Sequence, residues 1–157
     1  MQLPLVLDVC CGPKGFWFDK NDARALFVDK RKERLEYEAR GTFVMDIDPD
    51  IIASFDQLPF ADNSFALVVF DPPHVQRSAA KGSVTKRYGF LTGEWRQMLR
   101  HGFAECFRVL RAEGVLVFKW GESDCPVSEI LALTDQKPLF GQVSLRKPAT
   151  HWVVFMK

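Results

Sequence analysis

The sequence lacks the features that mark metal-binding, disulfide-stapled and membrane proteins. Its four cysteines include no Cys-x-x-Cys pair, and Cys10 and Cys11 are adjacent, too close for an ordinary disulfide. We therefore expect reduced thiols in a cytoplasmic protein, and no metal site. No stretch approaches the roughly 20 apolar residues that span a bilayer. The first residues also carry no basic segment of the kind that opens a signal peptide, so we expect no membrane partner.

Strong charge of either sign, internal repeats and low-complexity segments are missing too. The net charge is +1 over 157 residues, which supplies no global attraction to nucleic acid or membrane, although a local patch is compatible with it. The length is that of one domain with a sizeable core. We predict a single domain over residues 1–157, without a separate target-recognition domain.

What the sequence does contain is an alternation of short apolar runs with helix-favouring segments. We expect buried strands at 4–10, 25–29, 42–46, 65–70 and 115–120. We expect helices at 30–39, 94–114 and 127–135, and a short helix with a turn within 49–64. Two closing strands joined by a turn at 147–150 must be antiparallel. This order predicts an α/β fold, a Rossmann-like, doubly wound, mostly parallel seven-stranded sheet whose last strand is antiparallel.

Four of these strands end in an acid. Asp8, Asp29, Asp46 and Asp71 stand near, at or just after the strand ends. Ligands of open α/β sheets bind beyond the carboxyl ends of the strands, so we expect these acids along one rim. Asp29 follows Asp8 by 21 positions, a spacing typical of an acid that binds a ribose diol. The alternative interpretation is that Asp8 and Asp29 only form turns.

The connection after the first strand, DVCCGPKG, is a tight turn of small residues. It is not Gly-x-Gly-x-x-Gly, which argues against a bound dinucleotide and hence against a nicotinamide-dependent oxidoreductase. Only ten positions separate Gly15 from Ala25. We therefore expect the first helix to be short or missing.

Taken in order, several motifs resemble the class I S-adenosylmethionine-dependent methyltransferases. They are LVLDVCCGPKG, LFVDKR, VMDID, LPFADNSFALVVFDPPH, CFRVLRAEGVLVFKW and the closing strand pair. The resemblance covers nearly the whole chain. In its short length the chain is similar to the small members of this family found among phage and prophage proteins. It implies the sheet described above and S-adenosyl-L-methionine as cofactor.

The resemblance also implies roles for individual residues. The resemblance implies that the loop after the first strand wraps the methionine part of the cofactor, through Asp8, Cys10 and Gly12. It implies that Asp29 binds the ribose hydroxyls. It also implies that Asp46 and Ile47, near the third strand, contact the adenine. Cys10 stands where glycine is usual. Asp71 to His74 match the (Asp/Asn)-Pro-Pro-aromatic tetrapeptide of methyltransferases that act on amino nitrogens, with His74 in place of the usual aromatic residue.

The tetrapeptide Asp71-Pro72-Pro73-His74 suits a planar amine as substrate. The Asp71 carboxylate and the Pro72 carbonyl are two acceptors that can draw the nitrogen towards a tetrahedral shape. Prolines stiffen the backbone that aims these acceptors, and the His74 imidazole offers a flat face on which a base stacks. Catalysis then rests on positioning nitrogen, methyl and sulfur in line. The alternative is that these residues form only a turn after a strand.

Between Pro72 and Gly93 there is no acid but several basic and aromatic residues. This segment fits a substrate-binding lid that follows phosphates and stacks bases, or a solvated loop. With Pro73, the candidate substrate-binding residues are Arg77, Lys81, Lys86, Arg87 and Tyr88. Trp17 either caps the cofactor or packs in the core.

The function that these motifs predict is methyl transfer to an amino nitrogen, with adenine in DNA or RNA as the leading substrate. One alternative is a methyltransferase for a small-molecule or protein nitrogen. Another is a non-catalytic cofactor-binding subunit. Because the chain leaves no room for a DNA-reading domain, recognition of a duplex would need a homodimer or a partner protein.

Overall fold

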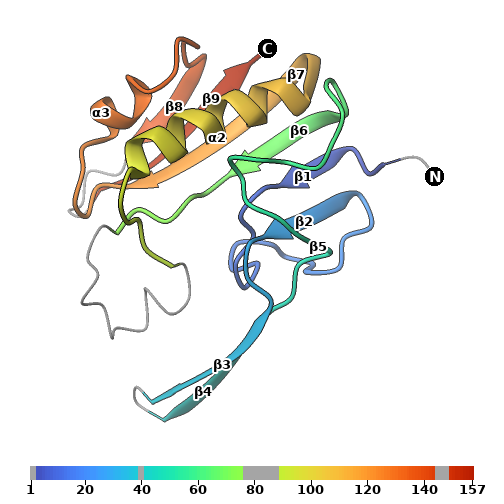
Figure 1. Ribbon diagram of the computed structural model, residues 1–157, viewed down its shortest axis with the longest axis vertical. Coiled ribbons are helices and arrows are strands. Elements are labelled where there is room, and N and C mark those ends of the chain that lie inside the picture. The colour runs from blue at the N-terminus through green and yellow to red at the C-terminus, as the bar shows by residue number, and fades with distance from the viewer. Residues whose placement is uncertain (1–2, 39–40, 76–88, 144–148) are drawn as a thin grey trace.

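The computed structural model describes residues 3–38, 41–75, 89–143 and 149–157, and its centre is a seven-stranded sheet (Figure 1). The strand order is β5 (Ile51–Ile52), β2 (Ala25–Asp29), β1 (Val6–Asp8), β6 (Phe65–Phe70), β7 (Leu110–Gly121), β9 (Thr150–Met156) and β8 (Phe140–Val143). The first five are parallel, and β9 runs antiparallel to both β7 and β8. The predicted mostly parallel sheet with an antiparallel last strand is confirmed.

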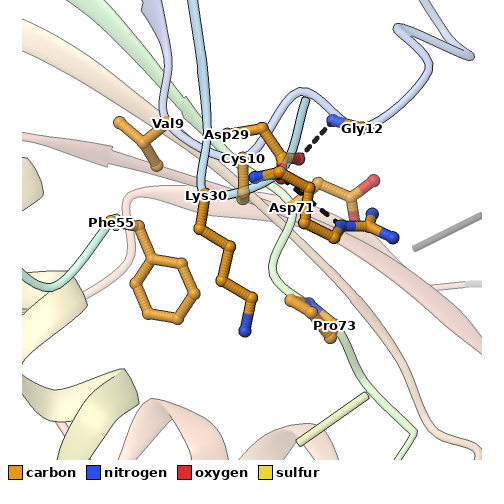
Figure 2. A pocket seen from close by; sticks show the side chains of 9 residues that line it. Val9, Cys10, Gly12, Asp29, Lys30, Phe55, Asp71 and Pro73 are labelled. Atoms are coloured by element: carbon orange, nitrogen blue, oxygen red, sulfur yellow. Dashed lines mark hydrogen bonds and ion pairs between the residues drawn. The ribbon is translucent and has the colours of Figure 1, made fainter. Parts of the chain in front are cut away.

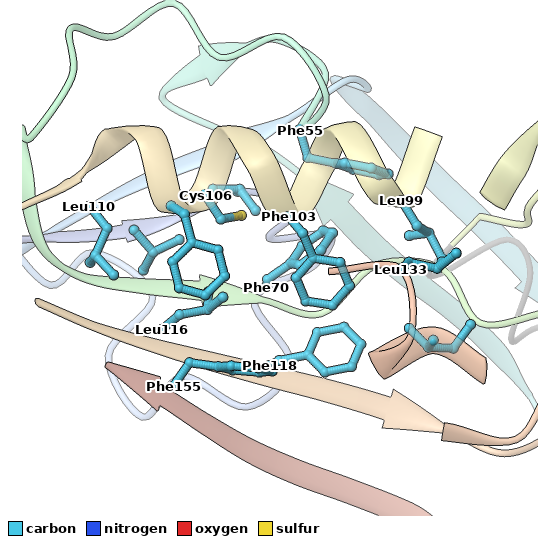
Figure 3. Close-up of a cluster of buried hydrophobic side chains, with 14 of the residues drawn as sticks. Phe55, Phe70, Leu99, Phe103, Cys106, Leu110, Leu116, Phe118, Leu133 and Phe155 are labelled. Carbon is cyan, nitrogen blue, oxygen red and sulfur yellow. The ribbon is translucent and has the colours of Figure 1, made fainter. Parts of the chain in front are cut away.

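One face of the sheet carries the main hydrophobic core. Helices α2 (Trp95–Val109) and α3 (Val127–Leu131) supply its cover, and α2 crosses in front of β6 and β7 (Figure 1). The core contains many aromatic side chains that meet edge to face or at a tilt, such as Phe70 against Phe103 with ring centroids 5.3 Å apart. Figure 3 shows this layer; its labelled members are Phe55, Phe70, Leu99, Phe103, Cys106, Leu110, Leu116, Phe118, Leu133 and Phe155.

Gly102 lets α2 approach the sheet and Phe55 closely. A Cβ at this position would lie 2.7 Å from Phe55 Cδ2 and 2.9 Å from Phe70 Cζ. Gly102→Ala adds about 1 kcal/mol of helix propensity, but overpacking of a core typically costs about 1–3 kcal/mol. We expect a net loss of about 1 kcal/mol in the free energy of unfolding, measured by urea denaturation.

The exposed Ala104 of the same helix gives the matched control for Gly102→Ala. Ala104→Gly should lose about 1 kcal/mol through propensity alone. A Gly102→Ala variant more stable than the wild type would show that Phe55 and Phe70 do not restrict the position.

The opposite face of the sheet is covered by the connection 9–24 between β1 and β2. This connection contains turns and no helix, so the first helix, which was expected to be short or missing, is missing. Trp17 packs edge to face on Phe27 with ring centroids 4.8 Å apart, and Phe16 packs on Trp152 at 5.6 Å. Trp17 therefore belongs to the packing of this face.

The segment 30–47 corrects two predictions. The helix expected at 30–39 is wrong, because this segment forms strand β3 (Glu33–Glu38). Strand β3 pairs antiparallel with β4 (Thr42–Ile47), and the resulting hairpin extends away from the main sheet (Figure 1). Leu35 pairs with Met45 and Arg34 with Asp46, so apolar and charged positions alternate with the period of a strand. The strand at 42–46 exists, but it lies outside the main sheet.

Two further boundaries differ from the prediction. Strand β5 and turns replace the short helix expected within 49–64, and β5 forms the edge of the sheet next to β2. Helix α2 ends at Val109 because Leu110 already pairs with Phe65 at the start of β7. The helix expected over 94–114 therefore ends before Gly114, which lies within β7. None of the helices described is long and apolar enough to cross a membrane.

Candidate functional site

A pocket lies beyond the carboxyl ends of β1, β2 and β6, where the chain order of the sheet reverses (Figure 2). Its lining comes from four loops and consists of Val9, Cys10, Gly12, Asp29, Lys30, Arg31, Phe55, Asp71 and Pro73. Two of the predicted rim acids, Asp29 and Asp71, thus line one pocket. This is the place at which open α/β sheets bind ligands.

The cavity between these side chains is small, with a volume of about 30 Å³. In the view of Figure 2 the Lys30 side chain extends between Phe55 and Pro73. Lys30 is an exposed residue, and a lysine side chain has several freely rotating bonds. A larger ligand would enter by displacing it.

Asp29 organises the backbone around the pocket. Its Oδ2 accepts a hydrogen bond from the Gly12 N–H at 2.9 Å, and its Oδ1 accepts one from the Arg31 N–H at 2.9 Å. The Arg31 Nε also lies 3.5 Å from Oδ1. Each carboxylate oxygen accepts about two hydrogen bonds, so Asp29 retains acceptor capacity for hydroxyl groups of a ligand. Gly12 adopts a φ of 50°, the left-handed region that favours glycine.

Asp8 lies below the pocket rather than in its lining. Its side chain is fully buried, accepts a hydrogen bond from Trp17 Nε1 at 2.8 Å, and accepts a longer one from the Cys10 N–H at 3.3 Å. Burial raises the pKa of Asp8 to about 7, with smaller contributions from the nearby Asp71 and Asp29, while the two hydrogen bonds lower it. Asp8 thus fixes the loop that carries Cys10 and Trp17.

Asp8 gives a pH-dependent contribution to stability. The raised pKa means that the folded protein holds a proton that the unfolded chain has released above pH 3.8, so this contribution is present at low pH and is lost as the pH rises through about 7. Asp8→Asn removes the titration but keeps an acceptor oxygen. We expect the stability of this variant relative to wild type to increase by about 2 kcal/mol between pH 5 and pH 7, measured by urea denaturation.

The exposed Asp135 provides a matched control for Asp8→Asn. Asp135→Asn should leave the pH dependence of unfolding as in the wild type. A constant stability difference between Asp8→Asn and wild type from pH 5 to pH 7 would contradict the proton uptake at Asp8.

Asp71 forms an ion pair that the sequence analysis missed. The Lys119 Nζ on β7 donates a hydrogen bond to Asp71 Oδ2 at 2.6 Å, and the Asp71 side chain is only 7% exposed. Burial raises the pKa of Asp71, although Lys119 opposes that shift. The signal for Lys119 in the sequence was a single charge within the apolar run VLVFKW.

The remaining tetrapeptide residues take different positions. Pro72 is buried and Pro73 lines the pocket. The His74 imidazole does not line the pocket but lies against β7, with its ring 6.1 Å from that of Trp120 and inclined by 70°. A Cβ on Gly121 would lie 3.0 Å from the imidazole. Burial lowers the pKa of His74, which favours the neutral ring.

The adenine-contacting positions expected from the sequence lie elsewhere. Asp46 is exposed on the hairpin, with an oxygen 3.8 Å from Arg34 Nη1, and Ile47 is buried at the end of β4. The expectation that Asp46 ends a strand of the main sheet is therefore wrong, and neither residue lines the pocket. Phe55 lines it instead, and no motif in the sequence had indicated that residue.

Cys10 lines the pocket as a protonated thiol. Burial, with the neighbouring Asp8, raises the pKa of Cys10 well above the ordinary value. The described residues contain no group of three or more His, Cys, Asp or Glu side chains that could hold a metal ion. The other candidate substrate-binding residues, Arg77, Lys81, Lys86, Arg87 and Tyr88, lie outside the described residues.

Comparison with solved structures identifies the fold. A methyltransferase from Methanosarcina mazei described as S-adenosylmethionine-dependent superposes with a TM-score of 0.60 at 12% identity, over 97% of this chain and 91% of that one. A 1,6-didemethyltoxoflavin-N1-methyltransferase from Burkholderia thailandensis, solved with S-adenosylhomocysteine, gives 0.55 at 14% identity, over 99% and 72%. A 16S rRNA (adenine(1408)-N(1))-methyltransferase from Catenulisporales acidiphilia gives 0.52 at 11%, over 99% and 85%.

These similarities show that the chain has the Rossmann-like fold of these methyltransferases. No protein-family model matches the sequence, and the search of curated proteins found no match. Because one fold can support many reactions, the activity must be argued from the site.

Proposed function

We propose that this protein is an S-adenosyl-L-methionine-dependent methyltransferase that transfers a methyl group to an amino nitrogen. The observation that carries the proposal is the convergence of Asp29 and Asp71 on one pocket at the carboxyl ends of β2 and β6. Asp29 suits a ribose diol. Asp71 and the two prolines after it suit a planar amine. A ligand between the two acids would place a methyl donor beside a methyl acceptor.

The pocket residues fit the cofactor. Asp29 would accept hydrogen bonds from the ribose hydroxyls. The Cys10–Gly12 turn would follow the methionine part, since Gly12 has no side chain to obstruct its approach. Phe55 would give the adenine an apolar surface, in place of Asp46 and Ile47. Bound there, the cofactor supplies a methyl group on a positively charged sulfur.

The chain positions the acceptor through Asp71 and its neighbours. The Asp71 carboxylate and the Pro72 carbonyl would accept the two hydrogens of the amine, which holds its nitrogen in line with the methyl group. The fixed φ of the prolines limits the motion of these acceptors. His74, in its neutral form, would offer a flat ring beside the site. The proton of the methylated nitrogen can pass to solvent after transfer.

The first substrate class to test is adenine in DNA or RNA. The tetrapeptide suits an exocyclic amine. A neighbour in fold is named as an rRNA adenine methyltransferase that acts on the ring nitrogen N1, which supports adenine as the base but not the exocyclic position. A homodimer or a partner protein would supply target recognition, and the setting would be cytoplasmic.

A small-molecule or protein nitrogen is the second candidate. The position of His74 against Trp120, outside the pocket lining, favours it. The neighbour in fold named for a toxoflavin precursor acts on a small molecule.

Transfer of radiolabelled methyl from the cofactor to DNA, RNA, protein and small-molecule fractions tests this proposal. Calorimetric titration with S-adenosylhomocysteine tests binding separately. Label in nucleic acid supports the first substrate class, and label only in the other fractions supports the second. Binding without label in any fraction indicates a non-catalytic cofactor-binding subunit, and absence of binding overturns the proposal.

A further inference from the structure

Lys119 is a charged residue in an otherwise apolar part of β7. Its strand neighbours Phe118 and Trp120 are fully buried on the face covered by α2. Because side chains alternate along a strand, Lys119 lies on the other face, where it pairs in register with Trp152. Its side chain is 22% exposed. A lysine held so far from solvent usually has a specific anionic partner.

That partner is the Asp71 carboxylate, and the geometry of the pair is asymmetric. The Lys119 Nζ contacts Oδ2 at 2.6 Å. Among the described residues, none donates a hydrogen bond to Oδ1. The ammonium also lies 5.7 Å from the centroid of the Phe16 ring and 5.6 Å from that of Trp152. These two rings limit the directions in which the lysine side chain can turn.

Each of the three acids near the pocket has a different partner. Asp8 has the Trp17 indole, Asp29 has backbone N–H groups with the Arg31 guanidinium, and Asp71 has Lys119. Lys119 is therefore the cation that compensates the buried charge of Asp71.

The other titratable groups that face Asp71 stabilise its negative charge less than Lys119 does. Asp8 and Cys10 come from the end of β1 and the loop after it, and His74 comes from the same loop as Asp71. A carboxylate at Asp8 disfavours a second negative charge nearby, and a protonated Cys10 adds no positive charge. His74 in its neutral form adds none either.

We infer that Lys119 is a positioning residue for the proposed transfer: it holds Oδ2 of Asp71 and leaves Oδ1 directed to the N–H of the acceptor. The inference rests on the proposed function and deepens it. A carboxylate that has taken up a proton donates a hydrogen bond from that oxygen and is a weaker acceptor than the charged form. Without Lys119, Asp71 would bind a proton at higher pH and would also lose its fixed orientation.

Carboxyl carbon NMR on protein labelled in its aspartates tests the pairing without any turnover. The Asp71 signal is assigned from its absence in Asp71→Asn. In Lys119→Met, which keeps the length of the side chain without the charge, we expect the pKa of Asp71 to rise by at least about one unit. Lys119→Arg should keep it near the wild-type value, as should Lys137→Met, which removes an exposed lysine. An unchanged pKa in folded Lys119→Met would overturn the inference.

The pH profile of methyl transfer tests the catalytic consequence, with the labelled acceptor fraction as substrate. We expect kcat of Lys119→Met to fall at least about tenfold at pH 7, with the acid limb of the profile moved to higher pH and the Kd for S-adenosylhomocysteine within about threefold of wild type. Lys119→Arg should recover most of the activity. A loss of thermal stability with an unchanged profile would show a merely structural lysine. Absence of transfer by the wild type would count against the proposed function, whereas the NMR titration would still decide the pairing.

Discussion

Asp71→Asn is expected to lower kcat for methyl transfer by about 10²- to 10³-fold, the loss typical when one preorganised hydrogen-bonding group is removed from an active site. The asparagine oxygen would accept the hydrogen bond from Lys119. Its amide N–H₂ would then face the hydrogens of the acceptor amine, so that a donor opposes a donor. The substitution therefore keeps the shape of Asp71 and removes its function. The assay is single-turnover transfer of labelled methyl.

Two measurements make the result at Asp71 specific. Circular dichroism melting establishes that the variant is folded, since a partly buried lysine left without its anion costs stability. The exposed Asp135→Asn carries the same chemical change away from the pocket and should retain full activity. Retention of activity within tenfold of wild type by folded Asp71→Asn would show that the tetrapeptide acid does not act on the acceptor.

Asp29→Asn is expected to raise the Kd for S-adenosylhomocysteine by about 100-fold. Hydrogen bonds to a charged group contribute about 1.5–3 kcal/mol each, and a loss of about 2.7 kcal/mol corresponds to 100-fold in affinity. In the wild type, Asp29 accepts hydrogen bonds from the backbone N–H groups of Gly12 and Arg31. The variant loses the negative charge, and its amide N–H₂ must face one of these two donors. Both the direct contact and the turn that carries Gly12 are weakened. Isothermal titration calorimetry measures the effect.

Asp48→Asn is the matched control for this effect. Asp48 is exposed and pairs with Lys32 near the base of the hairpin, so its change should leave cofactor affinity within about twofold. A Kd for Asp29→Asn within threefold of wild type would place the ribose elsewhere than at the end of β2. It would also leave the pocket without its proposed anchor.

The sequence by itself determined the sheet and most of the rim. Apolar runs such as 25–29 and 65–70 are too short for core helices and too continuous for half-exposed strands. Their length and continuity therefore indicate buried strands. The positions of Asp29 and Asp71 follow directly, because parallel strands bring their carboxyl ends to one edge. The amphipathic pattern from Trp95 onwards similarly specified α2.

Segment 30–47 is where sequence reasoning failed. The local propensity of residues 30–39 favours a helix. Such a helix would carry charged residues all around and would have no apolar face to bury. Pairing with 42–47 instead aligns Leu35 with Met45 and Arg34 with Asp46. Such cross-strand pairs depend on which segment comes opposite, and this is decided only when the chain folds back. Asp46 moved away from the rim as a consequence.

The partners of the acids were decided only by the tertiary structure. Lys119 lies 48 positions from Asp71 in the chain, and only the adjacency of β6 and β7 brings them together. Asp8 and Asp29 both stand near the end of a short apolar run, and only the structure shows that Asp8 has an indole partner whereas Asp29 has backbone N–H partners. The local sequence determines which groups can ionise and at which edge they lie. The packing around each group determines its charge and orientation, because desolvation and hydrogen bonding act only over contact distances.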